Sequence, residues 1–219
     1  MGTEERTAMA RVLEDDVREE QRQRLLDSAI RAISKHGFDT VRLRDIASDA
    51  GVTTGMIQYY FDSRQSFLTA ALEKVGLDQI EWWSRIGEIE ADPWKRITML
   101  IGACADPNPT VAVEQSAAWL EFCACATRHL ELRDILSAVN RRWRDVVLET
   151  IQTGTASGAF RPVLDEALIA DALIAMLDGC EMSIGSQAGL FDSDQARSVA
   201  TAVAQHLLNC APADRESAS

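Results

Sequence analysis

The stretch RDIASDAGVTTGMIQYYF, residues 44–61, decides the fold. It predicts a short helix, a turn that contains glycine, and a second short helix. Ala47 and Ala50 are small enough to let the two helices cross closely, and Gly51 permits the turn between them. Thr53 can cap the second helix, because its hydroxyl accepts from backbone N–H groups of the first turn. The stretch therefore predicts a helix-turn-helix.

The second short helix carries small and polar side chains on its outer face. Facing outward are Thr53, Thr54, Gly55, Gln58 and Tyr59. Such a face fits a major groove, where glutamine pairs with adenine, threonine methyls meet thymine, and glycine lets the two backbones approach closely. Two roles stay open for Gln58, which either reads a base or contacts only the DNA backbone. A plain three-helix scaffold is the alternative, but packing alone does not explain the outward polar set.

The same residues resemble the TetR family, whose usual line is T-[VML]-R-D-I-A-x-x-A-G-V-[ST]-x-G-x-[LI]-Y-x-[HY]-F-x-[SN]-K-E-x-L. The chain supplies LRDIA at 43–47, AGVT at 50–53, Gly55, Ile57, YF at 60–61 and SR at 63–64. The resemblance implies an all-α DNA-binding regulator. It places DNA contacts at Arg44, Thr53, Thr54, Gly55, Gln58 and Tyr59, with Tyr60 and Arg64 near phosphates.

Three positions depart from the family line. Arg42 replaces the threonine before Leu43, which removes an N-cap hydroxyl and adds a cation suited to phosphate. Gln58 stands where tyrosine is common, and Thr54 where a basic residue is common. The base preference therefore stays open, as does the choice between DNA contact and internal packing for Tyr60.

The flanking sequence predicts helices separated by short breaks, because apolar residues recur at three-and-four spacing and only 5 prolines occur. We expect a first helix from Glu19 to a stop at His36-Gly37, and a longer one from Arg64 to about Ile86. Later helices are expected at 111–127, 132–155, 166–187 and 193–208. The expected domains are a flexible leader 1–17, a helix-turn-helix domain 18–64, a ligand-binding and dimerisation domain 65–210, and a flexible tail 211–219.

Composition narrows the class of protein. The chain has 219 residues, is 47% hydrophobic and carries a net charge of -12, which argues against a protein that coats nucleic acid without regard to sequence. Residues 18–74 nevertheless hold nine Lys/Arg against eight Asp/Glu, about +1. The 5 cysteines lack a C-x-x-C spacing, and no signal sequence or membrane span is evident. A cytoplasmic protein is expected.

The C-terminal part has a more diffuse resemblance to the choline-responsive BetI-like branch of the same family. It rests on AWLEF at 118–122, RRW at 141–143 and AMLDG at 175–179. The branch implies a homodimer through the last two long helices, here about 167–187 and 193–208. Two apolar stripes agree with that interface, although an internal core would look similar. They are Ile169, Ala172, Leu173, Met176, Leu177 and Cys180, and Ala196, Val199, Ala200, Val203 and Leu207.

An effector pocket is expected inside the same part, because aromatic and thioether side chains form adaptable apolar sites. The candidates are Met99, Trp119, Phe122, Cys123, Trp143 and Met176. Ordinary core packing is the alternative for each of them. Three acidic residues, Glu121, Asp178 and Glu181, have two roles open: they hold a cation together with a tryptophan face, or they lie exposed.

Catalysis has little support in the sequence. The histidines His36, His129 and His206 are isolated, and no metalloprotease, nucleophile-elbow or phosphate-loop motif occurs, so neither a metal nor a cofactor is expected. We predict a repressor that is released from a palindromic DNA operator by a small-molecule effector. The alternatives are a small-molecule or redox sensor with a vestigial DNA module, and a helical enzyme.

Overall fold

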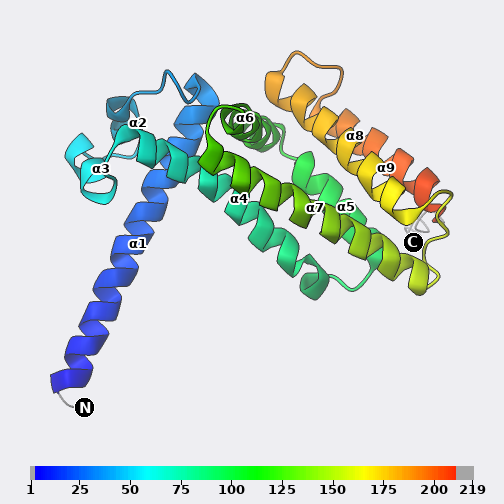
Figure 1. The fold of residues 1–219 in the computed structure, drawn as a ribbon, viewed down its shortest axis with the longest axis horizontal. Helices are drawn as coiled ribbons and strands as arrows, with labels where there is room; N and C mark the ends of the chain where they lie inside the picture. Colours follow the sequence, from blue (N-terminus) through cyan, green and yellow to red (C-terminus); the bar gives the residue numbers. More distant parts are fainter. Residues whose placement is uncertain (1–2, 211–219) are drawn as a thin grey trace, which may run out of the picture. The chain divides into compact units, whose positions relative to one another are not determined.

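The computed structural model describes residues 3–210, with side chains from Asp16 onward, and within that range the regular elements are helices and no strand occurs (Figure 1). The all-α prediction is confirmed. The chain divides into two compact units, with the boundary between Val75 and Gly76. The first unit contains α1 (Thr3–His36), α2 (Leu43–Asp49), α3 (Thr54–Tyr60) and the start of α4 (Arg64–Ile89). The second contains the rest of α4, α5 (Pro93–Cys104), α6 (Pro109–Ala126), α7 (Leu130–Ala156), α8 (Glu166–Ser186) and α9 (Ser193–Leu208).

The first helix is longer than the sequence predicts. It begins at Thr3, not near Glu19, so the expected flexible leader 1–17 is helical from Thr3 onward. Residues 3–36 contain neither proline nor glycine and are rich in glutamate, arginine, alanine and leucine, which favour helix. Because a helix already formed extends without a new nucleation cost, this stretch needs no apolar stripe of its own.

The first unit is built around a small apolar core. Leu25 and Ile33 of α1, Ile46 of α2 and Ile57 of α3 are at most 1% exposed. Gly51 takes a φ of 67°, a left-handed conformation that favours glycine, and the turn it makes joins α2 to α3. The expected helix-turn-helix is therefore present, and its two helices are held by a shared core.

The start of α4 belongs to this first core. Phe67, Leu68, Ala71 and Leu72 are fully buried, and the Phe67 ring lies 4.6 Å from that of Phe61. The first unit therefore runs to Val75, eleven residues beyond the expected boundary at residue 64. These four side chains follow a helical spacing that the sequence shows, but spacing alone does not say which core they enter.

The second unit is organised around α8, which packs against α5, α6, α7 and α9. Its closest approach is to α6. A Cβ added at Gly185 would lie 2.8 Å from the backbone carbon of Ser116, so only glycine fits there. Between α7 and α8, the Nε of Arg144 donates to the carboxylate of Asp171 at 2.6 Å. These contacts hold the helices that carry the expected effector residues.

Side-chain caps fix where α5, α6, α8 and α9 begin, whereas His129 before α7 makes no such bond. Asp92, Asn108, Asp165 and Asp192 each accept backbone N–H groups from the first turn that follows. Proline occupies the first turn of both α5 and α6, where its missing N–H costs nothing. The expected later helices agree with the observed bounds to within two residues.

Candidate nucleic-acid interface and effector region

Helix α3 begins at a capped position. Thr53 is the N-cap, and its hydroxyl accepts from the Met56 N–H at 3.3 Å. The cap holds the first turn of α3 in helical geometry without using any of the outward side chains that follow. Ile57, 1% exposed, anchors the opposite face of α3 in the core.

The outer face of α3 is exposed over its whole length. Thr53, Thr54, Gly55, Gln58 and Tyr59 all lie on the surface, and Tyr59 is 69% exposed. The structure thus brings five of the expected DNA-contacting residues together on one short helix. An exposed tyrosine ring beside small polar side chains can enter a groove, since no neighbouring part of the first unit covers it.

Among the residues that the structure describes, no contact requires a glycine at position 55. Its φ is not left-handed, and a Cβ added there would meet only the Thr53 hydroxyl, at 3.7 Å, which is ordinary contact. A glycine within a helix nevertheless costs stability relative to alanine. No contact among the described residues explains the glycine, whereas a close approach from the solvent side of α3 would.

Two arginines flank the start of α2. Arg42 is the N-cap residue and is exposed, and its side chain makes no cap hydrogen bond, in line with the loss of the usual threonine hydroxyl. The Arg44 side chain is 70% exposed, and its Nε lies 3.4 Å from Asp45. Exposed ion pairs of this kind are weak, so Arg44 can exchange Asp45 for a phosphate or a base edge.

The two residues expected near phosphates are only half-exposed. Tyr60 packs its ring edge-on against Tyr59, with 5.1 Å between centroids. Arg64 directs its guanidinium into the first unit, where it donates to the backbone carbonyls of Phe38, Asp39 and Val41. Arg64 thus differs from Arg42 and Arg44, whose side chains extend into solvent.

The expected effector residues fall into separate places in the second unit. Trp119 and Phe122 of α6 lie edge to face with 5.6 Å between ring centroids. Trp143 stacks on Trp83 of α4 at 4.5 Å, and both rings are at most 5% exposed. Sequence reasoning missed Trp83. Its helical spacing from Ile80 and Ile86, three residues to either side, was the available signal, but it did not identify the partner.

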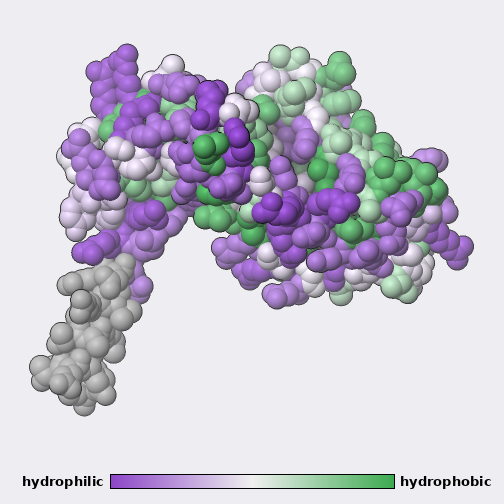
Figure 2. All heavy atoms as spheres, in the orientation of Figure 1, coloured by the Kyte–Doolittle hydropathy of each residue, from purple (hydrophilic) through white to green (hydrophobic). Residues whose placement is uncertain are grey.

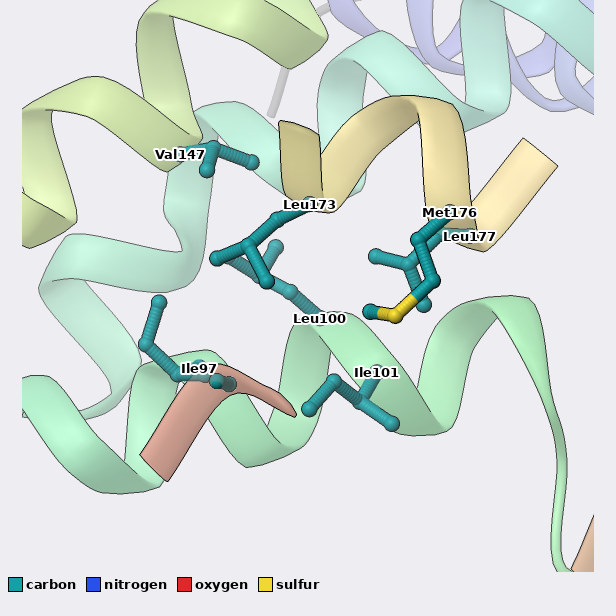
Figure 3. Close-up of a pocket in the computed structure, with 8 residues that line it drawn as sticks. Ile97, Leu100, Ile101, Val147, Leu173, Met176 and Leu177 are labelled. Carbon is teal, nitrogen blue, oxygen red and sulfur yellow. The ribbon is translucent and has the colours of Figure 1, made fainter. Parts of the chain in front are cut away.

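A small pocket lies between α5, α7, α8 and α9 (Figure 3). Its lining is entirely apolar: Ile97, Leu100, Ile101, Val147, Leu173, Met176, Leu177 and Ala204. The free space holds no more than about one water molecule. Of the six expected effector residues, only Met176 lines it. The other lining residues are aliphatic, and aliphatic residues are the commonest core residues, so no sequence signal singled them out.

Helix α8 also carries a buried acidic residue, Glu181, four residues after Leu177 of the pocket. Glu181 is 8% exposed, and burial, with the nearby charge of Asp178, raises its pKa to about 8. Burial, together with the charges of Glu181 and Asp178, raises the pKa of the Cys123 thiol to about 12 and that of Cys104 well above its usual value. The four groups therefore lie close together, at the meeting of α5, α6 and α8.

The carboxyl of Glu181 has no cation beside it among the described residues. No lysine or arginine contributes to its pKa shift, and no hydrogen bond or ion pair reaches it within residues 16–210. A largely buried carboxyl in that state favours its neutral form below pH about 8, because burial disfavours the ionised form and no cation offsets that cost.

The last two helices present a second apolar face to solvent. Leu168 and Met182 of α8 are 54% and 60% exposed, and Val199 of α9 is 36% exposed. In Figure 2, apolar residues gather over the part of the second unit that contains α8 and α9. Most of the two predicted stripes is internal instead: Ile169, Leu173, Leu177, Cys180, Ala196 and Ala200 are buried within the chain. For those residues the expectation of an interface is wrong.

These features match two families of bacterial regulators. Residues 25–71 match the family described as bacterial regulatory proteins, tetR family, and residues 95–209 match the family described as BetI-type transcriptional repressor, C-terminal. The chain belongs to the TetR family of transcriptional regulators, with a C-terminal part of the BetI type. The resemblance expected from residues 44–61 is thus confirmed.

Individual relatives agree with this assignment. The HTH-type transcriptional regulator BetI of Rhizobium meliloti (strain 1021) is 30% identical over 73% of this chain and 75% of its own. The repressor KstR2 of Mycolicibacterium smegmatis (strain ATCC 700084 / mc(2)155) is 26% identical over 68% of this chain and 72% of its own. A solved regulator from Saccharomonospora viridis, in complex with choline, superposes with a TM-score of 0.75 and 26% identity, covering 86% of this chain and 97% of that one. The relatives are regulators of transcription, and no described helix is long and apolar enough to cross a membrane.

Proposed function

We propose that the chain is a cytoplasmic, homodimeric repressor that binds a palindromic operator through α3 and leaves it when a small organic cation binds the second unit. The observation that carries the proposal is Gly55, which stands in an exposed, polar helix face although nothing inside the chain requires a glycine. A DNA backbone that approaches α3 closely supplies the missing reason.

An exposed stripe on α8 supports the dimer. Leu168, Ala172, Ala175, Gly179 and Met182 follow three-and-four spacing and all lie on the surface of the single chain. A Cβ added at Gly179 would meet nothing within 4 Å, so no internal contact explains this glycine. Small residues between two large apolar ones let a second helix approach closely, as a copy of this chain would. The proposed interface therefore uses this stripe in place of Ile169 and its buried neighbours.

The geometry around Glu181 supports a cationic effector. Leu177 lines the apolar pocket, and Glu181 lies four residues later on the same face of α8, about 6 Å along the axis. The pocket offers a dry wall for methyl and methylene groups, while the unpartnered carboxyl offers a charge. Choline, the ligand of the Saccharomonospora viridis regulator, combines these two features and is the probe of choice.

The small size of the pocket explains how a bound ligand would weaken operator binding. A pocket that holds about one water molecule must widen before any organic cation enters. The ligand therefore prefers the widened conformation, and this preference is the free energy available to weaken operator binding.

The test is a footprint on the DNA upstream of the gene and its neighbours, with and without choline. We expect a palindromic footprint that Arg44→Ala and Gln58→Ala abolish, and that choline weakens in the wild type but not in Glu181→Gln. Glu88→Gln, the same change at an exposed site on α4, is the matched control. Binding that is weak and blind to sequence would instead favour a sensor with a vestigial DNA module.

The pH dependence of choline binding separates the cation site from a purely apolar one. A cation stabilises ionised Glu181, so the ligand must displace the proton that the carboxyl holds below pH about 8. Affinity should therefore rise roughly tenfold per pH unit below that value and level off above it. An affinity that does not change between pH 6 and pH 8 would contradict the role given to Glu181.

A further inference from the structure

Arg64, the first residue of α4, is bonded to the connection between α1 and α2. Its Nη2 donates to the carbonyl oxygens of Phe38 at 2.6 Å, Val41 at 2.8 Å and Asp39 at 3.2 Å, and its Nε donates to Val41 at 3.1 Å. The side chain is half-buried. One guanidinium thus gathers three carbonyls of a four-residue segment.

This segment leads directly into the DNA-facing part of the first unit. It is followed by Arg42, the N-cap of α2, whose carbonyl accepts the N–H groups of Asp45 and Ile46 at 3.0 and 3.2 Å. Because the Arg42 side chain does not cap the helix, the start of α2 lacks the usual local anchor. The Arg64 guanidinium supplies a fixed point one residue earlier, at Val41.

The chemistry of the side chain matters here. A guanidinium is a rigid planar fork that donates in several fixed directions at once, and its bonds are charge-assisted. A lysine ammonium carries the same charge but is a single point, and cannot span these carbonyls in the same way.

We propose that Arg64 is a positioning residue that fixes the start of α2, and with it Arg42 and Arg44, and that it is not a phosphate ligand. The proposal rests on the proposed operator binding. Nε and Nη2 are committed to three carbonyls within the first unit, so neither can contact a phosphate without breaking these bonds.

The test compares operator affinity over a salt series, from about 50 to 300 mM, for wild type, Arg64→Lys and Arg64→Gln. Removing one phosphate contact lowers the slope of log K against log salt by about 0.9. We expect both variants to bind about tenfold more weakly with an unchanged slope, because the contacts to DNA remain but their geometry is less fixed. Arg42→Ala should lower the slope, and Arg24→Lys, at an exposed site on α1, should change neither quantity.

Two results would overturn the proposal. One is a slope that falls by about 1.8 in Arg64→Gln, because the dimer would lose one phosphate contact from each protomer. The other is wild-type affinity in Arg64→Lys, since lysine preserves a phosphate contact but not the carbonyl fork.

Hydrogen exchange keeps the test independent of DNA. In Arg64→Lys the amides of Asp45 and Ile46 should exchange faster while those of α1 around Ile33 do not, which separates loss of the anchor from global unfolding. If the wild type fails to bind any operator, the proposed function fails, but faster exchange at α2 still supports the anchor. Unchanged exchange there refutes it.

Discussion

At the scale of single residues, Gly55 is the position where stability and function conflict most directly. The helix around it would be more stable with alanine, and a Cβ there meets only the Thr53 hydroxyl at an ordinary distance. We expect Gly55→Ala to raise the free energy of unfolding by about 0.5–1 kcal/mol. Operator affinity should fall at least tenfold, because the added methyl group occupies the space of the approaching DNA backbone.

Thermal unfolding and a gel-shift titration of the same protein batch check both halves of this prediction. Gly102→Ala on α5 is the matched control, since its Cβ also meets nothing within 4 Å and the site belongs to neither α3 nor the proposed dimer interface. Operator affinity that is unchanged in Gly55→Ala would leave this glycine unexplained.

Glu181 makes stability depend on pH. Its folded pKa, about 8, lies above its ordinary value of 4.5, so the folded state holds a proton that the unfolded state releases between those values. Stability from this group is thus complete below pH 4.5 and is lost as the pH rises to about 8. Glu181→Gln should remove this pH-dependent loss of stability, because glutamine does not ionise.

We therefore expect Glu181→Gln to be more stable than wild type by a few kcal/mol at pH 8, and the difference to shrink toward pH 5. Urea unfolding at both values measures it, with Glu88→Gln as the control. A variant that is destabilised equally at both pH values would show that the carboxyl makes a structural contact instead.

The sequence identified the residues of α3 correctly as an outward set, because the distance along a short helix determines which face a residue occupies. It did not reveal the role of Arg64. Its three acceptors are backbone carbonyls more than 20 residues away, and backbone positions leave no trace in the identity of the side chains there.

At the scale of helices, the ends were the most predictable feature. Asp92 before Pro93 and Gly37 after α1 are local signals whose geometry is decided within one turn. The start of α1 was missed because no cap or apolar stripe marks it. The part of α1 before Glu19 extends a helix that is already formed further along the chain, so it needs no signal of its own to mark its N-terminal end.

Helix α8 shows why periodicity could not separate core from interface. Ile169, Leu173 and Leu177 face inward while Leu168 and Met182 face solvent, so the helix is apolar nearly all round. A helix with two apolar faces has two partners, and the sequence alone does not say which face belongs to the same chain.

A charged residue introduced into the exposed stripe of α8 tests whether this stripe forms the dimer interface. Ala175→Arg places a long cation in the middle of the proposed interface without touching the internal core, since Ala175 is exposed. We expect the dissociation constant of the dimer to rise more than tenfold, because an unpaired buried charge opposes association. Analytical ultracentrifugation measures it, and Gln152→Arg on the exposed face of α7 serves as control. A monomeric wild type would refute the interface outright.

At the scale of the whole chain, charge is divided between the two units. Residues 1–75 hold 11 Lys/Arg against 13 Asp/Glu, a charge of -2, and within them residues 18–74 carry about +1. Residues 76–219 hold 11 Lys/Arg against 21 Asp/Glu, a charge of -10. The second unit is therefore repelled by DNA, and specific affinity has to come from the few cations and polar groups of the first.

This division predicts a site of limited length. Two copies of α3 related by a two-fold axis should protect half-sites about 34–36 Å apart, one helical turn of DNA. Footprinting should show protection confined to these half-sites, with binding that weakens steeply as salt rises. Protection that spreads along the DNA as protein is added would indicate binding without a defined dimer.

The raised pKa values of the cysteines in the second unit determine how these thiols react with oxidants. Peroxides attack the thiolate, and a thiol such as Cys123, with a pKa of about 12, is ionised in only about one molecule in 10⁵ at neutral pH. Cys104 and Cys180 are buried and have raised pKa values as well. Burial, together with the acidic groups on α8, therefore makes these three sulfurs chemically quiet, and peroxide should leave them unmodified.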